Sequence, residues 1–460
     1  MIRAHRDAVP SSTAAQVPHR PPSRPQRPAD TASAYDLTFW YTYAANTATM
    51  AAVSLLFRYA DFVHFLGGTE YNLGWIVGAG MVGSLLMRLA QGLGIDTYGA
   101  RQVWLWSSGL LVVSLLGHLW IERIDTLGIY LLRVLYTTSI AGIFGASITS
   151  ISRRAPTWRI AEVVGTLGTS GFVGMVLGSL LGDYLLPAAA TQRWQVDQMF
   201  YAAAGLGAAS LVFAWLATRG HVPPERRKHV PIGRLLRRYH PGSVLLISVA
   251  MGVAIGLPHA FLRPYTEQMG IQRIAVFFGI YAPVAFVTRM LIRGLPARVG
   301  IRPMILAGMG SMIVGLLLYL TVRTEWQLVA PATCQGIAHA FLFPAVIAGG
   351  SSTFPSRYRG VGTTLVLAMF DLGTLFGAPA VGGILHGAAA AGLSSQAGYW
   401  LMFVIVAALM MLVTLIYGVG EWRAGRQTTH SRRRRRPPRR RARLSPRTEI
   451  ATAMAEAVDP

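Results

Sequence analysis

Two stretches of the chain decide its fold: SLLMRLAQGLGIDTYGAR at residues 84–101 and AFVTRMLIRGLPARVGIR at residues 285–302. They align without a gap when the first is shifted by 201 positions. Three positions carry the same residue in both copies: Arg88 and Arg289, Gly99 and Gly300, and Arg101 and Arg302. Each copy ends an apolar block and opens a polar connector, so the pattern predicts a chain built from two related halves.

The composition indicates that lipid, rather than water, surrounds most of the chain. Of the 460 residues, 53% are hydrophobic and 13% are charged, and the mean hydropathy is +0.43. A soluble protein usually carries about 25% charged residues. The apolar residues stand in long blocks, and a helix needs roughly 20 of them to cross a bilayer. Many blocks reach that length, which indicates an integral membrane protein.

Twelve apolar segments can be placed along the chain, six in each half. They cover residues 38–66, 73–93, 102–121, 127–151, 162–186, 197–218, 243–268, 274–294, 303–323, 327–351, 362–388 and 396–420. We therefore predict an all-α integral membrane fold, with twelve transmembrane helices in two pseudo-symmetric six-helix halves. The predicted regions are a disordered cytoplasmic tail (1–36), the first half (37–218), a central cytoplasmic loop (219–241), the second half (242–420) and an Arg-rich disordered cytoplasmic tail (421–460).

The arginines predict which way the chain lies in the membrane. Basic residues hold short loops on the cytoplasmic side of a bilayer. The connectors after segments two, four, eight and ten, both tails and the central loop are rich in arginine, whereas the other connectors are short and mixed. Twelve spans with both termini cytoplasmic place every Arg-rich piece on one side. The predicted location is therefore the plasma (inner) membrane, crossed many times.

Several functional classes are disfavoured by what the sequence lacks. The net charge of +23 does not indicate nucleic-acid binding, because no compact domain with a basic face is visible. The chain has no His-Glu-x-x-His pair, Gly-x-Ser-x-Gly elbow or phosphate-binding glycine loop, which argues against an enzyme and against an ATP-driven pump. We expect no cofactor and no metal, and the single cysteine, Cys334, excludes an intramolecular disulfide.

The two tails carry weaker signals. Residues 1–34 lack the apolar core of a signal peptide, so we expect none to be cleaved. The Arg-rich tail either binds anionic lipid head groups or only helps to fix the orientation of the chain. Both interpretations of that tail stay open from the sequence.

The connector after the second segment resembles the signature of the major facilitator superfamily (MFS). It reads Gly92-x-x-x-Asp96-x-x-Gly99-x-Arg101, with Thr97 where a basic residue is usual. In the second copy the first Gly and the Asp are replaced, whereas the last Gly and Arg remain. The short motif, repeated at this distance in a chain with twelve predicted spans, is typical of that superfamily.

Two later stretches, 335–344 and 370–379, resemble the proton-linked efflux branch of the superfamily, often labelled arabinose- or drug-efflux permeases. Arg133 resembles an arginine that many members carry in the fourth helix. The resemblance covers roughly residues 37–420. It implies alternating access driven by a proton gradient, with segments one, four, seven and ten lining a central cavity. We expect the chain to act as a monomer.

Ionisable groups inside spans predict a cytoplasmic gate, because each such group needs a partner or a water-filled cavity. Arg88 and Asp371 lie in neighbouring segments of the implied fold at similar depth, and we predict that they pair. The pair would hold the cytoplasmic side closed, or it would only neutralise two buried charges. By the same symmetry, Arg289 is predicted to face Glu162. The other gate candidates stand in the signature connectors: Asp96, Arg101 and Arg298.

Charged and His residues in the cavity-lining segments are the candidates for substrate binding or proton coupling. Together with the gate residue Asp371, these are Arg58, Asp61, Arg133, His259, Arg263 and His339. A cavity rich in arginine favours an anionic or zwitterionic solute, and histidines near neutral pH can couple to protons. Alternatively, Arg58 and Asp61 share one helical face and neutralise each other near the outer rim. On that view the histidines are packing residues.

The sequence therefore predicts a secondary active transporter that moves a small organic solute across the membrane, with proton-coupled export favoured. Proton-coupled uptake of a small, possibly anionic, metabolite is the main alternative. A lipid flippase or a receptor on the same fold is a further alternative. The expected partners are the solute, protons and the lipid bilayer, and no nucleic acid.

Overall fold

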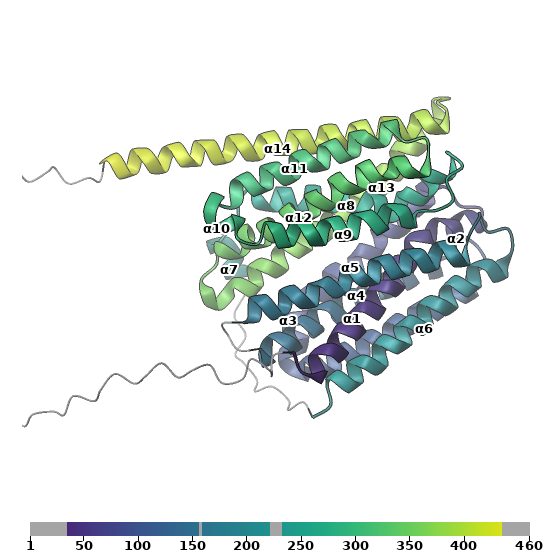
Figure 1. Ribbon diagram of the computed structural model, residues 1–460, viewed down its shortest axis with the longest axis horizontal. Coiled ribbons are helices and arrows are strands. Elements are labelled where there is room, and N and C mark those ends of the chain that lie inside the picture. Colours follow the sequence, from purple (N-terminus) through teal and green to yellow (C-terminus); the bar gives the residue numbers. More distant parts are fainter. Residues whose placement is uncertain (1–34, 156–158, 221–231, 435–460) are drawn as a thin grey trace, which may run out of the picture.

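The computed structural model describes residues 35–155, 159–220 and 232–434 (Figure 1). Inside the helices a few side chains are not described, among them that of Asp96 and those of residues 421–434. The expectations for the N-terminal tail and for most of the central loop lie outside the described residues. Residues 421–434 of the Arg-rich tail, predicted to be disordered, instead continue the last helix of the chain, whereas the hypothesis that this tail binds anionic lipids concerns side chains outside the described residues.

Local signals in the sequence set the helix bounds of the first half. Its elements are α1 (Leu37–Leu55), η2 (Leu56–Arg58), α2 (Tyr59–Phe65), α3 (Glu70–Gly117), η3 (His118–Trp120), α4 (Leu127–Arg154), α5 (Ile160–Leu185) and α6 (Arg193–Ala217). The Asp36 carboxylate caps α1 by accepting a hydrogen bond from the Phe39 amide at 2.8 Å. The long α3 contains two spans, because Gly99 breaks it with a φ of +86°. Glycine suits that φ because it has no Cβ.

The second half repeats this plan. Its elements are α7 (Ile232–Arg238), α8 (Val244–Glu267), α9 (Ala275–Leu291), α10 (Leu295–Val299), α11 (Ile301–Leu318), η4 (Tyr319–Thr321), η5 (Glu325–Leu328), α12 (Val329–Ser352), η6 (Ser356–Tyr358), α13 (Arg359–Ala390) and α14 (Ser395–Arg434). Gly300 separates α10 from α11 with a φ of +83°. Gly99 and Gly300, which match in the sequence repeat, therefore make the same kind of backbone turn.

In the part of the chain that the structure describes, ten helical segments are long and apolar enough to cross a bilayer. Two more spans do not meet both of these criteria, although α1 alone has 19 residues. The run from Leu37 to Phe65 is interrupted by the η2 turn, and the apolar α9 has 17 residues. With these two, the described part of the chain holds the twelve spans that the sequence predicts. The chain is a multi-pass membrane protein with an all-helical fold.

Successive spans run in opposite directions, so the connectors alternate between two ends of the bundle (Figure 1). We call the end at which α1 begins the near end, and the opposite end, where α2 meets α3, the far end. Within the first half, α1 packs against α5 and α6, and α3 folds back on itself and packs against α4. Across the halves, α13 packs on α3 and α9 packs on α5. These two cross-half contacts position the candidate site.

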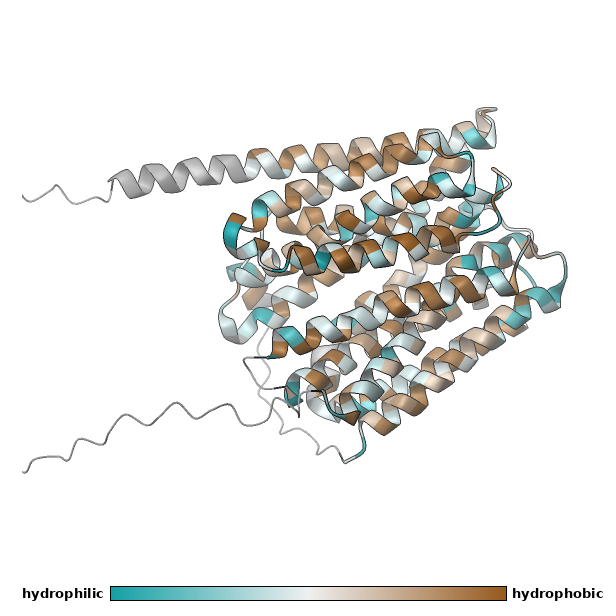
Figure 2. Cartoon of the chain, in the orientation of Figure 1, coloured by the Kyte–Doolittle hydropathy of each residue, from teal (hydrophilic) through white to brown (hydrophobic). Residues whose placement is uncertain are grey.

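The outer surface of the bundle is apolar along the helices and more polar at their ends (Figure 2). Large apolar side chains such as Trp106, Leu291 and Leu415 are mostly exposed. In a membrane this surface contacts lipid tails, which are as apolar as a leucine side chain. The exposure of these residues is therefore what a lipid-facing surface requires.

Glycines allow close helix contacts in both halves. Gly178 of α5 faces the backbone of Ala51 in α1, and Gly373 of α13 faces the backbone of Val249 in α8. Neither position has room for a Cβ atom. Small residues on one helical face let backbones approach in membranes, where helix packing depends on close van der Waals contact.

Candidate functional site

Charged residues inside the spans meet where the two halves touch. At the far end, four of them form one cluster, which we call the far-end tetrad: Arg58, Asp61, Asp183 and Arg263. Arg58 Nε lies 2.7 Å from Asp61 Oδ2, and Arg58 Nη1 lies 3.0 Å from Asp183 Oδ1. Arg263 Nε, from the second half, lies 3.0 Å from Asp61 Oδ1. Asp61 therefore binds one arginine of each half.

The far-end tetrad is buried and electrically neutral. Both of its arginines are 0% exposed, and Asp61 is 3% exposed. Further hydrogen bonds cross between the halves: Arg58 Nη1 donates to the Gln272 carbonyl at 3.1 Å, and Asp183 Oδ2 accepts from the Ala275 amide at 2.7 Å. Removing one partner of a buried ion pair costs about 3–5 kcal/mol, because it leaves an uncompensated charge. The tetrad thus joins the halves while all four members are charged.

Local backbone features explain why these side chains meet. The one-turn η2 helix interrupts the first span at Arg58, and Asp61 follows three residues later on the same side. On α8, Arg263 stands one turn before Glu267, whose carboxylate lies 3.8 Å from Arg263 Nη2. At the rim, His64 Nδ1 lies 3.8 Å from Glu267 Oε2, a further contact between the halves.

Towards the near end, α3 and α13 form the ion pair that the sequence predicts. Arg88 Nε and Nη2 lie 2.5 and 3.2 Å from the two carboxylate oxygens of Asp371. The Ser84 hydroxyl donates a further hydrogen bond to the same carboxylate at 2.5 Å. The side chains of Arg88 and Asp371 are 18% and 5% exposed. The structure thus brings the two residues together across the halves, while their role as a gate stays a prediction.

The pair predicted between Arg289 and Glu162 is wrong. Glu162 binds its neighbour Arg159, with 2.8 Å between Nη2 and Oε1, and it accepts a hydrogen bond from the Tyr35 hydroxyl at 2.9 Å. An arginine three residues away on the same helix face reaches Glu162 without any contact between the halves. Arg289 lies instead over the ring of Phe172 in α5, 5.3 Å from the ring centroid.

Two candidate histidines lie in aromatic surroundings at the contact between the halves. His339 of α12 hydrogen-bonds to Tyr281 of α9, with 2.5 Å between Nδ1 and the hydroxyl oxygen. Its ring lies 5.8 Å from that of Phe172 in the first half. The ring of His259 in α8 lies 4.8 Å from that of Phe57, also in the first half. The structure therefore places both rings where the halves meet.

Arg133 lies inside the first half, away from the far-end tetrad. Its guanidinium carbon lies 4.5 Å from the ring centroid of Tyr59 and 4.7 Å from that of Tyr136. Its Nε and Nη1 atoms are buried without a hydrogen-bond partner. Two aromatic faces attract the cation, and such contacts are worth about 2 kcal/mol when desolvated.

The candidates in the signature connectors are not part of either charge cluster. Arg101 is partly buried on α3, Arg298 is exposed on α10, and the side chain of Asp96 lies outside the described residues. Two further residues at the contact between the halves, Asp183 and Phe172, were not predicted from the sequence. Asp183 could have been found as an acidic residue inside an apolar segment. Phe172 carries no such signal, because a phenylalanine is ordinary in a span.

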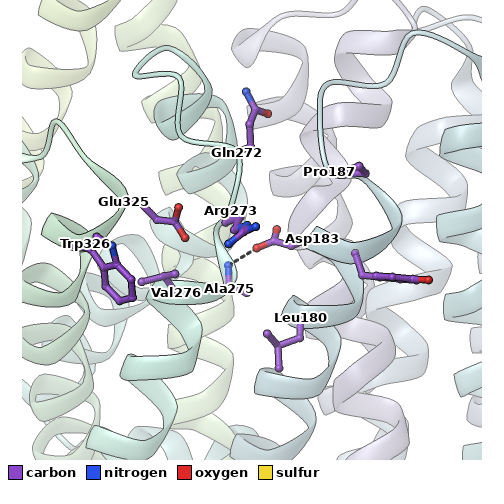
Figure 3. A pocket seen from close by; sticks show the side chains of 10 residues that line it. Leu180, Asp183, Pro187, Gln272, Arg273, Ala275, Val276, Glu325 and Trp326 are labelled. Carbon is purple, nitrogen blue, oxygen red and sulfur yellow. Dashed lines mark hydrogen bonds between the residues drawn. The ribbon is translucent and has the colours of Figure 1, made fainter.

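A pocket of about 740 Å³ lies beside the far-end tetrad (Figure 3). Residues of both halves line it: Leu180, Asp183, Tyr184, Pro187, Gln272, Arg273, Ala275, Val276, Glu325 and Trp326. Figure 3 shows Asp183 hydrogen-bonded to the Ala275 backbone on the pocket wall. The pocket therefore adjoins one of the hydrogen bonds that join the halves. Within the described ranges, no group of three or more His, Cys, Asp or Glu side chains could hold a metal ion.

A comparison with protein families matches most of the chain. The family model described as Major Facilitator Superfamily matches residues 37–324 and 277–456. These two matches overlap in the middle of the chain and include all twelve spans.

Similar proteins include two whose names refer to multidrug efflux or multidrug resistance. A probable multidrug-efflux transporter of Mycobacterium tuberculosis is 30% identical over 205 residues, which are 42% of this chain and 41% of that protein. The chain thus matches less than half of that relative's length. The multidrug resistance protein MdtG of Citrobacter koseri is 23% identical over 345 residues, which are 69% of this chain and 79% of that protein.

Solved structures with the same fold include two transporters. The nucleoside transporter NupG has a TM-score of 0.68 at 12% identity, covering 84% of this chain and 99% of that one. A D-xylose-proton symporter has a TM-score of 0.64 at 16% identity, covering 82% and 96%. At these identities the likeness shows the fold alone.

Proposed function

The chain belongs to the Major Facilitator Superfamily, and on that premise we propose that it exports a small organic solute by alternating access, coupled to protons. The two halves would move against each other and expose a central site first at the near end and then at the far end.

The observation that carries the proposal is that ion pairs join the halves at two depths. The far-end tetrad joins α2 to α8, and the Arg88–Asp371 pair joins α3 to α13 towards the near end. Alternating access requires that contacts at one end open while those at the other end close. Ion pairs suit this because each charged group can take another partner or water when the halves separate.

The far-end tetrad and the neighbouring Glu267 contain the partners that the two arginines need when the halves separate. Arg58 and Asp183 belong to the first half and stay together when the halves part. Arg263 moves with the second half and has Glu267 on its own helix, 3.8 Å away. Opening the far end therefore leaves each arginine with an acidic partner in its own half. This keeps the free-energy barrier between the closed and open states low.

Asp371 is the candidate proton site. Its carboxylate accepts hydrogen bonds from Arg88 and Ser84 at the contact between α3 and α13. A proton on this carboxylate would remove the charge that Arg88 pairs with and would weaken the contact between the halves. Proton binding and conformational change would then be linked through one ion pair.

Two observations support export across the inner membrane with both termini cytoplasmic. Relatives described as multidrug-efflux and multidrug resistance proteins are 30% and 23% identical to the chain. The near end carries the arginine-rich connectors, and such connectors favour the cytoplasmic side.

The test is solute flux in sealed proteoliposomes with an imposed proton gradient, using a pooled library of metabolites and drugs. Wild type and Asp371→Asn are compared, with Asp197→Asn as a control because Asp197 pairs with Arg193 on the same helix, α6. We expect a solute to move opposite to the proton flow in the wild type and the control, and we expect Asp371→Asn to lose the dependence on the gradient. Movement with the protons would indicate uptake. Binding without movement would indicate a receptor and reject transport.

A further inference from the structure

Arg88 and Arg289 occupy equivalent positions of the sequence repeat, but they have different partners. Arg88 of α3 meets the carboxylate of Asp371 in α13. Arg289 of α9 meets the ring of Phe172 in α5, with 5.3 Å between the guanidinium carbon and the ring centroid. Both contacts join one half to the other. The charge is therefore neutralised on one side of the pseudo-symmetry axis and not on the other.

The sequence repeat also shows why Arg289 has no acidic partner: a phenylalanine, Phe172, occupies the position equivalent to Asp371. The glycine runs of α5 and α13 align when Gly174 is set against Gly373, and both glycines face the backbone of the first helix of their own half. In that alignment Phe172 falls on Asp371. The contact between α9 and α5 therefore contains an arginine, Arg289, and an aromatic ring at the position where the contact between α3 and α13 has a carboxylate.

Arg289 is left without a counter-charge in an apolar span. Its side chain is partly buried, and its Nε atom is buried without a hydrogen-bond partner. Among the described residues, no carboxylate lies within ion-pair distance of it. The Tyr281 hydroxyl of the same helix, α9, is bound to His339. An uncompensated charge in a span is costly and marks a functional position.

We propose that the solute supplies this counter-charge, and that it is an organic anion with a flat apolar part, such as an aromatic carboxylate. The proposal rests on the transport function proposed above and names its substrate class. The guanidinium presents donors in a planar fork that matches a carboxylate. The ring centroids of Phe172 and Phe343 lie 5.8 and 5.3 Å from the centroid of the His339 ring. These two rings supply apolar surface beside His339 for the flat part of the solute.

The other arginines inside the spans do not compete for this role. Arg58 and Arg263 are neutralised within the far-end tetrad, and Arg88 is neutralised by Asp371. Arg133 also lacks a counter-charge, but it lies against two tyrosine rings inside the first half and not at the contact between the halves. Arg289 is thus the uncompensated charge at the contact between the halves, among the described residues. It selects anions and repels cations there.

One test needs no ligand. In lipid nanodiscs, Arg289→Gln should unfold at no lower temperature than the wild type, because it removes a charge that nothing balances. Arg88→Gln leaves the buried Asp371 carboxylate without its arginine partner, so this variant should unfold at a clearly lower temperature. A similar fall in both variants would show that Phe172 already satisfies Arg289 and would overturn the proposal.

The second test uses 2-naphthoate as the anionic probe and 2-naphthamide as its neutral equivalent, with binding measured by thermal stabilisation in nanodiscs. We expect the carboxylate to stabilise the wild type and the amide to have no effect. Arg289→Gln should weaken binding about ten-fold or more, because one charge-assisted contact is lost, and Arg289→Lys should restore part of it. Arg293→Gln, at an exposed site just after α9, is the matched control. No stabilisation of the wild type by naphthoate, or equal stabilisation of Arg289→Gln, would reject the anion site.

Flux in proteoliposomes separates this proposal from the transport function. Movement of cationic or neutral compounds, but of no carboxylate, would keep transport and reject the anion site. Naphthoate binding that depends on Arg289, without movement of any compound, would keep the site and reject transport.

Discussion

Replacing Asp61 by Asn should shift the protein towards a conformation that is open at the far end. In the wild type, the Asp61 carboxylate binds Arg58 of its own half and Arg263 of the other half. In the variant, Arg58 keeps Asp183 and Arg263 keeps Glu267, each within one half. The closed state would then hold both arginines buried with one close carboxylate, Asp183 at 3.0 Å, and one more distant, Glu267 at 3.8 Å, whereas separation of the halves lets water solvate both guanidinium groups.

The size of the shift follows from the burial of the far-end tetrad. Both arginines are 0% exposed, and removing one partner of a buried ion pair costs about 3–5 kcal/mol. This cost falls on the closed state. A change of about 3 kcal/mol alters the ratio of two conformations about 150-fold.

Maleimide labelling of one buried cysteine measures this ratio. Ala275 is 6% exposed at the far-end contact, so a cysteine there should react slowly in the closed state and faster when the far end opens. The native Cys334 is first replaced by Ala. The labelling rate of Ala275→Cys should then rise by about two orders of magnitude when Asp61→Asn is added.

The control is Asp197→Asn, which breaks the 2.7 Å pair between Arg193 and Asp197 at the same end of the bundle. This pair lies within α6 and does not join the halves, so the labelling rate should not change. The reasoning is refuted if folded Asp61→Asn labels at the wild-type rate, or if the control variant accelerates labelling to the same extent.

Three further predictions concern other contacts. Asp371→Asn removes the carboxylate that pairs with Arg88, so it should lower the melting temperature in nanodiscs and abolish gradient-dependent flux. If neither the melting temperature nor the flux changed, Asp371 would have no part in the mechanism. Gly178→Val forces a side chain against the α1 backbone and should destabilise the fold by about 1–3 kcal/mol in detergent denaturation, and a neutral effect would contradict the close packing. Tyr281→Phe removes the hydroxyl bound to His339 and should cost about 1 kcal/mol of stability; thermal denaturation that shows no loss would mean the hydrogen bond is not formed.

The Arg88–Asp371 pair could be predicted because three independent signals in the sequence agreed. Each residue is a charge inside an apolar segment, the two stand at similar depth, and the resemblance makes their helices neighbours. The same reasoning failed for Arg289 and Glu162, because it did not consider that Arg159 on the same helix face reaches Glu162 first. A nearby partner within one helix was readable from the sequence and should have been preferred.

The far-end tetrad shows a different limit. The spacing of Arg58 and Asp61 predicts that they neutralise each other, and they do. Their contact with Asp183 and Arg263 depends on how three spans, the first span, α5 and α8, are rotated about their axes. A rotation of one helix by a single residue position turns a side chain by about 100°, from a neighbouring helix towards lipid. No local pattern contains that information.

The sequence by itself determined the apolar lengths that make twelve spans, the repeat of two halves, and the glycines that turn the backbone at residues 99 and 300. These are properties of short stretches, set by hydrophobic length and by the φ angles that a residue allows. Only the tertiary structure decided which charges meet across the halves. It joins Asp61 to two arginines and leaves Arg289 against Phe172. Such pairings arise from helix packing between segments that are far apart in the chain, where a shift of a few ångströms decides whether a charge has a partner.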